Sequence, residues 1–79
     1  MVHNLDIFQK FFVPVEDGRK TFEVREKRDR IFSVGDTIVL SEIEDVSKKP
    51  TGRYINKTIT YVLEDENFCK KGYVILGIK

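Results

Sequence analysis

Residues 18–36 read GRKTFEVREKRDRIFSVGD, and they bring a glycine turn, an alternating strand and a charge cluster together in one short stretch. Within it, the segment TFEVR alternates strictly between polar and apolar residues. Successive side chains of a β-strand project to opposite faces. We therefore predict a strand over residues 21–26 whose apolar residues, Phe22 and Val24, enter the core. Its polar residues would line the other face.

That polar face is the first candidate site. It carries Thr21, Glu23 and Arg25, and Lys20 precedes it at the turn. An Arg–carboxylate pair keeps guanidinium donors for a phosphate or a base carbonyl, and the carboxylate can accept a hydrogen bond from an exocyclic amine. The pattern predicts a polar pocket for a ligand. A solvated strand face held by a structural ion pair is the alternative.

The composition indicates one soluble domain spanning residues 1–79. A chain of 79 residues with 41% hydrophobic content is long enough for one compact core. No apolar run approaches the ~20 residues of a membrane span, and the first residues lack the features of a signal peptide. Cys69 is the single cysteine, so no internal disulfide is possible. These features predict a cytoplasmic protein.

The charges are nearly balanced overall but unevenly distributed. The chain has 14 basic and 13 acidic residues, which argues against a domain that binds long nucleic acids mainly through their phosphates. Basic residues outnumber acidic ones over residues 19–30. Such a patch on a neutral domain suits a small anionic or nucleotide ligand. A solvated, charged hairpin explains it equally well.

The N-terminal segment predicts a short strand over residues 2–5 and then a helix. Asp6 is the candidate N-cap of that helix. One apolar face is expected from the spacing of Phe8, Phe11, Phe12 and Val15. Pro14 within this segment predicts a kinked or late-starting helix, and Gly18 is suited to the left-handed conformation after its end.

Three further strands follow from alternation and β-branched content. We expect them at residues 37–43, 53–63 and 73–78, the last being apolar on both faces and central in the sheet. A tight turn over residues 33–36 and a polar loop over residues 44–52 separate them. Five short strands and one helix predict an α+β domain, mainly β. Its form would be a small, mostly antiparallel β-barrel with the helix flanking its opening.

The signature residues also resemble a known family. Residues 18–25, GRKTFEVR, are similar to the G-x-K-x-x-E-x-R motif of the ASCH (activating signal cointegrator homology) domains. A compact bacterial and phage branch of that family also matches the residues that come after the motif, namely Asp29-Arg30, Phe32 and residues 34–36. The N-terminal His3-x-Leu5 and the closing residues 72–77 look like the same branch. The resemblance implies a PUA-like barrel with a cleft between barrel and helix. It also implies that Lys20, Glu23 and Arg25 line this cleft, which would bind RNA, a nucleotide or a modified nucleoside.

The same resemblance carries an alternative function. Some small ASCH relatives are amidohydrolases that deacylate N4-acetylcytidine, using a Lys after the glycine turn, a Thr three residues later and a Glu from a later segment. Lys20 matches that Lys, whereas Glu23 stands where the Thr would be. Glu42 and Glu44 are the nearest candidates for the later acid. A binding module is the first hypothesis, with Lys20 and Glu23 as catalytic candidates if the protein is an enzyme.

Two residues outside the motif complete the candidate ligand set. His3 can act as a proton donor to a ligand, or it can be a satisfied histidine beside a strand. Arg30, next to Asp29, can contact a ligand or brace its own loop. We expect Gly35 and Asp36 to serve the turn.

The remaining chemistry of the sequence is sparse. Cys69 is expected to be a passive thiol, because it has no metal or redox partner at a characteristic spacing. The three tyrosines could offer a stacking surface for a base, although packing on strands explains them as well. The sequence contains no phosphate-binding glycine loop, metal cluster or Ser/His/Asp set. No cofactor or metal is therefore expected.

Overall fold

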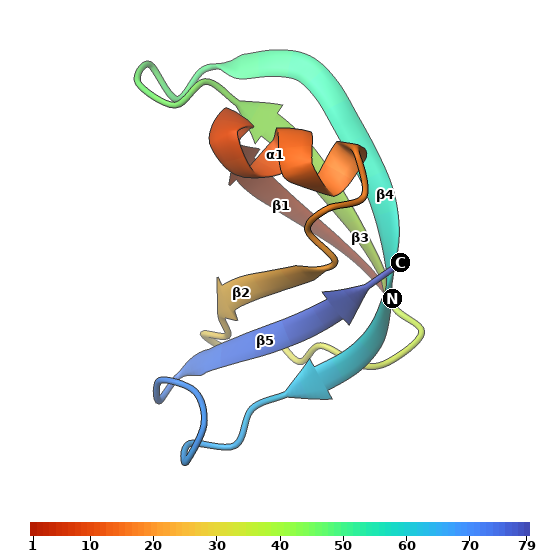
Figure 1. Ribbon diagram of the computed structural model, residues 1–79. Coiled ribbons are helices and arrows are strands. Elements are labelled where there is room, and N and C mark those ends of the chain that lie inside the picture. Colours follow the sequence, from red (N-terminus) through yellow and green to blue (C-terminus); the bar gives the residue numbers. More distant parts are fainter.

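The computed structural model describes residues 1–79 and contains five strands and one helix (Figure 1). In chain order these are β1 (Val2–Phe8), α1 (Gln9–Glu16), β2 (Phe22–Glu26), β3 (Thr37–Ile43), β4 (Pro50–Leu63) and β5 (Tyr73–Ile78). The prediction of an α+β domain, mainly β with a single helix, is confirmed. That helix has eight residues, and the chain contains no helix long and apolar enough to cross a membrane.

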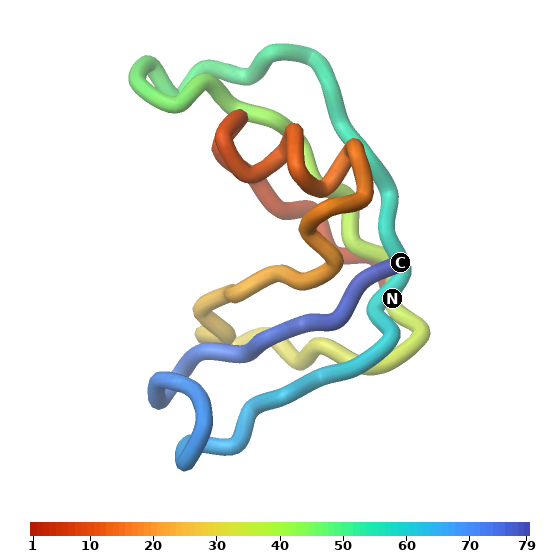
Figure 2. The backbone as a smooth tube through the Cα atoms, viewed as in Figure 1, coloured from red at the N-terminus to blue at the C-terminus, as the bar shows by residue number.

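All five strands belong to one mixed sheet with the order β1-β3-β4-β5-β2. β1 and β3 are parallel, and the other three pairings are antiparallel. β4 is long and curved: its first part pairs with β3, and its second part, from Ile59 onward, pairs with β5 (Figures 1 and 2). We call β1, β3 and the first part of β4 the first half-sheet, and the second part of β4, β5 and β2 the second half-sheet. This strongly bent arrangement is consistent with a small barrel-like fold.

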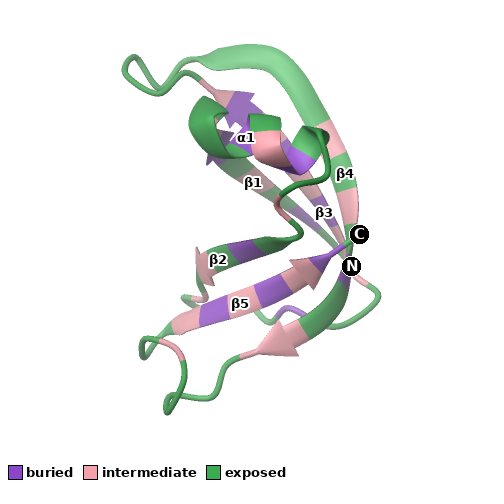
Figure 3. Cartoon of the chain, in the orientation of Figure 1, coloured by how far each residue is buried: buried purple, intermediate pink, exposed green.

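The core fills the inner side of the bend. α1 packs on β1 and β3 through Phe12 and Val15, which are both buried. Buried residues alternate with partly buried ones along β5, where Val74, Leu76 and Ile78 point inward (Figure 3). Burying each such side chain contributes roughly 1.5–3 kcal/mol. β5 lies between β4 and β2, as predicted for a central strand.

The expectation that Phe22 and Val24 enter the core was wrong. Phe22 is 46% exposed and Val24 is 53% exposed, whereas Glu23 is only 3% exposed. The pairing register sets this orientation, because Glu23 lies opposite the buried Leu76 of β5 and shares its inward face. A buried carboxylate is tolerated where charged donors satisfy it, as Lys20 and Arg25 do here.

The helix begins later than an N-cap at Asp6 would place it. Asp6 lies in β1, whose parallel pairing with β3 continues as far as Phe8, and Phe8 occupies the N-cap position without a side-chain cap. The late start expected from Pro14 is therefore found, with Pro14 inside the helix. Gly18 adopts φ +86° just after the helix, where a residue with a Cβ would be strained.

The remaining boundaries differ little from expectation. β3 and β5 have the predicted bounds, and the strand predicted over residues 21–26 begins at Phe22. β4 starts at Pro50 instead of Arg53, because Pro50 already pairs with Ile43 across the hairpin.

Candidate functional site

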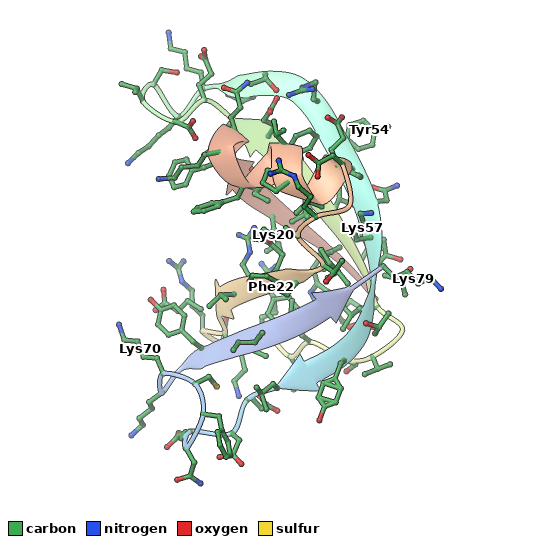
Figure 4. All side chains as sticks on the ribbon, viewed as in Figure 1. Lys20, Phe22, Tyr54, Lys57, Lys70 and Lys79 are labelled. Atoms are coloured by element: carbon green, nitrogen blue, oxygen red, sulfur yellow. The ribbon has the colours of Figure 1, made fainter.

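A cleft of about 400 Å³ lies between the β1–α1 segment and β2. Its volume is in the range of small-ligand sites. The lining residues come from both sides of the seam between the two edge strands: Asp6, Ile7, Phe8, Phe11, Lys20, Phe22, Glu23, Val24 and Arg25. Figure 4 labels Lys20, which lies between α1 and β2, and Phe22, the first residue of β2. The three residues predicted to carry the site therefore do meet at one cleft.

Glu23 is the centre of the polar part of this cleft. Its Oε1 accepts hydrogen bonds from Arg25 Nε at 3.1 Å and Arg25 Nη2 at 2.7 Å. Its Oε2 is in direct contact with Lys20 Nζ. The backbone brings Lys20 there, since the chain reverses after α1 and the Lys20 amide donates to the Pro14 carbonyl at 2.9 Å. A single buried carboxylate thus holds two cations in place.

Arg25 also bridges the seam between the edge strands. Its Nη1 donates to the backbone carbonyl of Asp6 in β1 at 2.8 Å. β1 and β2 are the two ends of the sheet order and are not paired with each other through their backbones. The Arg25 side chain therefore joins the two walls of the cleft while it orients Glu23.

The trio of Lys20, Glu23 and Arg25 retains hydrogen-bonding capacity for a ligand. Lys20 donates to Glu23 and, at 2.8 Å, to the Phe22 carbonyl, which uses two of its three protons. Arg25 uses three of its five N–H groups in the contacts above. The side chains of Lys20 and Arg25 are 17% and 20% exposed, so solvent and small molecules can reach them.

Aromatic side chains form the apolar part of the cleft. The ammonium of Lys20 lies 4.9 Å from the ring centroid of Phe22 and 5.7 Å from that of Phe11. These rings are 46% and 43% exposed. The spacing of the apolar residues predicts Phe11 on the packed face of the helix, and its place in the cleft lining follows only from the position of α1 across the cleft from β2. Apolar walls above a charged floor suit a flat heterocycle.

The other predicted ligand residues lie outside this lining. Thr21 is exposed, and its carbonyl accepts a hydrogen bond from the Ile78 amide at 3.0 Å. His3 is buried against the Phe32 ring, with 4.6 Å between ring centroids. The guanidinium of Arg30 lies over the same Phe32 ring, 5.7 Å from its centroid. His3 and Arg30 instead line a shallow hollow at the start of β1.

Asp36 does more than shape its turn. Its carboxylate accepts hydrogen bonds from the Ser33 amide at 3.1 Å and the Met1 amino group at 3.1 Å, and it lies 2.8 Å from His3 Nε2. The hydrogen bond to His3, followed by that to the Met1 amino group, lowers the pKa of Asp36 to about 2. This carboxylate ties β1 to the turn before β3.

The depressed pKa of Asp36 predicts a pH dependence. Because the folded state favours the ionised carboxylate, its stabilising effect is complete above the ordinary pKa of 3.8 and is lost as the pH falls towards about 2. We expect Asp36→Asn to be less stable than the parent near pH 6, with a difference that narrows below pH 4. Urea denaturation at a series of pH values measures this. Asp29→Asn, which removes a carboxylate without an ion pair, is the control, and parallel profiles for Asp36→Asn and the parent would contradict the assignment.

Glu42 and Glu44 also lie outside the cleft. Glu42 is fully buried and accepts hydrogen bonds from Arg53 Nε at 2.8 Å, Arg53 Nη2 at 2.7 Å and Thr51 Oγ1 at 2.6 Å. Arg53 is the main cause of the lowered pKa of Glu42. Glu44 accepts from Ser47 Oγ at 2.7 Å. The alternation of β3 is the sequence signal for Glu42, since it follows the buried Ile38 and Leu40 at period two.

The single cysteine and the tyrosines are placed apart from the trio. Cys69 Sγ lies 3.3–3.8 Å from the backbone carbonyls of Leu63, Asp65 and Tyr73. Tyr54 and Tyr61 of β4 are 65% and 62% exposed. No group of three or more His, Cys, Asp or Glu side chains gathers where a metal ion could be held.

Comparison with known proteins places this architecture in a family. No curated protein sequence matches the chain. The model of one family, described as a domain of unknown function (DUF3850), matches residues 2–78. The match includes both walls of the cleft and all six elements of secondary structure. The chain therefore belongs to the DUF3850 family.

Proposed function

We propose that the protein is an ASCH-like binding module whose cleft takes the base of a nucleotide, of a modified nucleoside or of RNA. One observation carries the proposal: the buried Glu23 is held between Lys20 and Arg25 at the floor of an aromatic-walled cleft of about 400 Å³. The proposal is supported because the charged and aromatic side chains of this cleft match the hydrogen-bonding groups and the flat ring of a nucleobase. The resemblance to ASCH domains points to the same class of ligand.

The lining matches the groups that a base presents. A heterocyclic ring can lie beside the exposed faces of Phe11 and Phe22. The unused N–H groups of Lys20 and Arg25 can donate to ring nitrogens or carbonyl oxygens, and Glu23 can accept from an exocyclic amine. The lining residues include two acidic and two basic ones, so their charges cancel. A neutral polar ring therefore suits the interior better than a phosphate, which would stay outside in solvent.

Stability alone does not explain the buried charges of Lys20, Glu23 and Arg25. Apolar residues of similar volume commonly replace a buried ion pair without loss of stability, and often with a gain. Here the three charges line the floor of an open cleft, where Lys20 and Arg25 remain partly accessible beside the buried Glu23. Placement at a cleft supports a binding role.

The binding experiment is a titration of the purified protein with cytidine, CMP and N4-acetylcytidine, followed by NMR or calorimetry. We expect Lys20→Ala and Arg25→Ala each to weaken binding by about tenfold or more, because each removes a charged hydrogen-bond donor. Arg19→Ala is the matched control, since Arg19 adjoins Lys20 in the chain but is 70% exposed and pairs with Asp17. Absence of binding by every nucleoside and nucleotide, with a folded protein, would refute the proposal.

The direct contact between Lys20 and Glu23 supports deacylation of an N4-acylated cytosine nucleoside as a second candidate. Neither Glu42 nor Glu44 lines the cleft, and the other acidic residue on the lining is Asp6. Cytidine release from N4-acetylcytidine is measured in the same samples. Turnover that disappears in Lys20→Ala would identify an enzyme, and Asp6→Asn would test the second acid. Stable binding without cytidine release identifies a binding module.

A further inference from the structure

The outer face of the second half-sheet is apolar and lies next to the cleft. The pairing register places Phe22, Gly77 and Tyr61 in one row across the three strands, and Val24, Ile75 and Leu63 in the next row. Side chains in one row project to the same face. The intervening row holds Glu23, Leu76 and Val62, which point to the core side. We call the six residues of the first two rows the outer face.

No element of the fold covers this face. Phe22, Val24 and Tyr61 are 46%, 53% and 62% exposed. α1 packs on β1 and β3 in the first half-sheet, and Figure 1 shows it away from the surface formed by β5 and the second part of β4. The other three residues, Leu63, Ile75 and Gly77, are half-buried. An apolar surface with exposed residues on both outer strands is typical of an interaction site.

The outer face is continuous with the cleft. Phe22 and Val24 belong to both, because β2 is an edge strand whose outward side chains also line the cleft. A ligand seated against Lys20 and Glu23 can therefore leave the cleft over Phe22 and continue towards Tyr61. The occupant of the outer face is thus expected to be a continuation of the molecule in the cleft.

Gly77 keeps the middle of the first row open. Its φ is not in the left-handed region, so backbone conformation does not require glycine there. A Cβ at this position would lie 3.0 Å from Thr60 Oγ1 and 3.3 Å from Tyr61 Cβ, so these neighbours would have to shift by a few tenths of an ångström. Adjacent strands lie about 4.8 Å apart, so β2 and the second part of β4, which flank β5, are roughly 10 Å apart. Phe22 and Tyr61 therefore lie on either side of an open strip at Gly77. Two aromatic surfaces separated by an open strip suit consecutive flat rings.

Cations at the rim fit a phosphate backbone. Lys70 Nζ lies 5.0 Å from the ring centroid of Tyr73, which follows the two rows along β5. Lys70, Lys71 and Lys79 make no ion pair within the chain. A lysine beside an aromatic side chain, as Lys70 is beside Tyr73, belongs to the combination with which proteins hold single-stranded nucleic acid.

We propose that the ligand is a single-stranded oligonucleotide, with one base in the cleft and the neighbouring base stacked on Tyr61. This inference rests on the proposed function, because it takes the cleft to hold a base. Stacking on an exposed aromatic side chain tolerates any base, so Tyr61 contributes affinity and length preference without selecting sequence.

The test compares one nucleotide with a short strand. Fluorescence anisotropy measures binding of a labelled hexacytidylate RNA, and unlabelled CMP is measured by competition. We expect Tyr61→Ala to weaken RNA binding by about tenfold and to leave CMP binding unchanged. Tyr54→Ala is the matched control: it removes an equally exposed tyrosine of the same strand, β4, from the first half-sheet. It should change neither affinity.

The outcomes separate this inference from the proposed function. Equal RNA affinity in Tyr61→Ala, Tyr54→Ala and the parent would overturn the inference, and the proposed function would stand if CMP binding still depended on Lys20. Absence of binding of the RNA and of every nucleoside and nucleotide by the folded parent protein would overturn both. Dimerisation of the parent in sedimentation, abolished by Tyr61→Ala, would assign the face to a second copy of the chain and also overturn the inference. Tyr61→Thr, a substitution that suits a strand, replaces the alanine variant if that variant does not fold.

Discussion

Glu23→Ala is expected to weaken nucleoside binding strongly and to lower the free energy of unfolding by about 2–3 kcal/mol. The carboxylate is 4% exposed and is the common partner of Lys20 and Arg25. Without it, two like charges remain side by side in a partly buried position, and both lose the carboxylate that orients them. The combined loss of an acceptor and of two positioned donors should weaken binding by about a hundredfold. Calorimetric titration and urea denaturation measure the two effects.

Two further variants show whether the effect belongs to the cleft. Glu26→Ala is the control, because Glu26 lies on the same strand but faces solvent and pairs loosely with Arg28 at 3.6 Å. It should change stability by less than about 0.5 kcal/mol. The triple variant Lys20→Met, Glu23→Met, Arg25→Met should recover most of the stability and still not bind. Nucleoside binding by the triple variant would show that the trio is only structural.

Arg53→Ala is expected to give the largest loss of stability among the charged positions, with a melting temperature lower by roughly 10 °C or more. Arg53 makes a bidentate contact with the completely buried Glu42, and its guanidinium lies 5.0 Å from the Phe12 ring centroid. Alanine would leave a buried carboxylate with only the uncharged donors Thr51 and Gln9. Breaking a buried pair at one partner costs more than the pair itself contributes.

The pH dependence of this variant should have the opposite sign to that of the parent. In the parent, Arg53 lowers the pKa of Glu42, so the pair stabilises the fold above the ordinary value of 4.5 and loses this effect as the pH falls through the lowered pKa. In Arg53→Ala, desolvation raises the pKa of Glu42, so acidification should relieve the destabilisation. Thermal unfolding between pH 7 and pH 3 tests this. Arg28→Ala, which removes an exposed pair, is the control, and an Arg53→Ala profile parallel to the parent would contradict the prediction.

The sequence predicted which residues share a face better than which face is buried. Alternation correctly put Glu23 and Arg25 together on β2, and it gave the bounds of β3 and β5. Hydrophobicity then favoured Phe22 and Val24 as core residues. The actual orientation depends on pairing with β5 and on the contact between Arg25 and the Asp6 carbonyl, which are 19 residues apart. Such a contact leaves no periodic signal in the strand itself.

The same reason explains the other differences. Asp6 and the residues after it have a helix-like apolar spacing, but parallel pairing with β3 holds Asp6 in a strand, and that pairing is set by residues 37–43. His3 meets Asp36 across 33 positions and is thereby drawn away from the cleft. Local pattern predicts the elements, and long-range pairing decides which side chains reach the site.

The position of β2 in the sheet also affects how the chain matures during synthesis. β2 precedes β3, β4 and β5 in the chain, yet its only partner in the sheet is β5, residues 73–78. A chain that emerges from the ribosome can assemble β1, α1, β3 and the first part of β4 earlier, whereas β2 must wait for the last strand. Lys20, Glu23 and Arg25 are therefore synthesised early but meet as a site late. The wall of the cleft that β2 forms therefore takes its place in the sheet only once residues 73–78 are available.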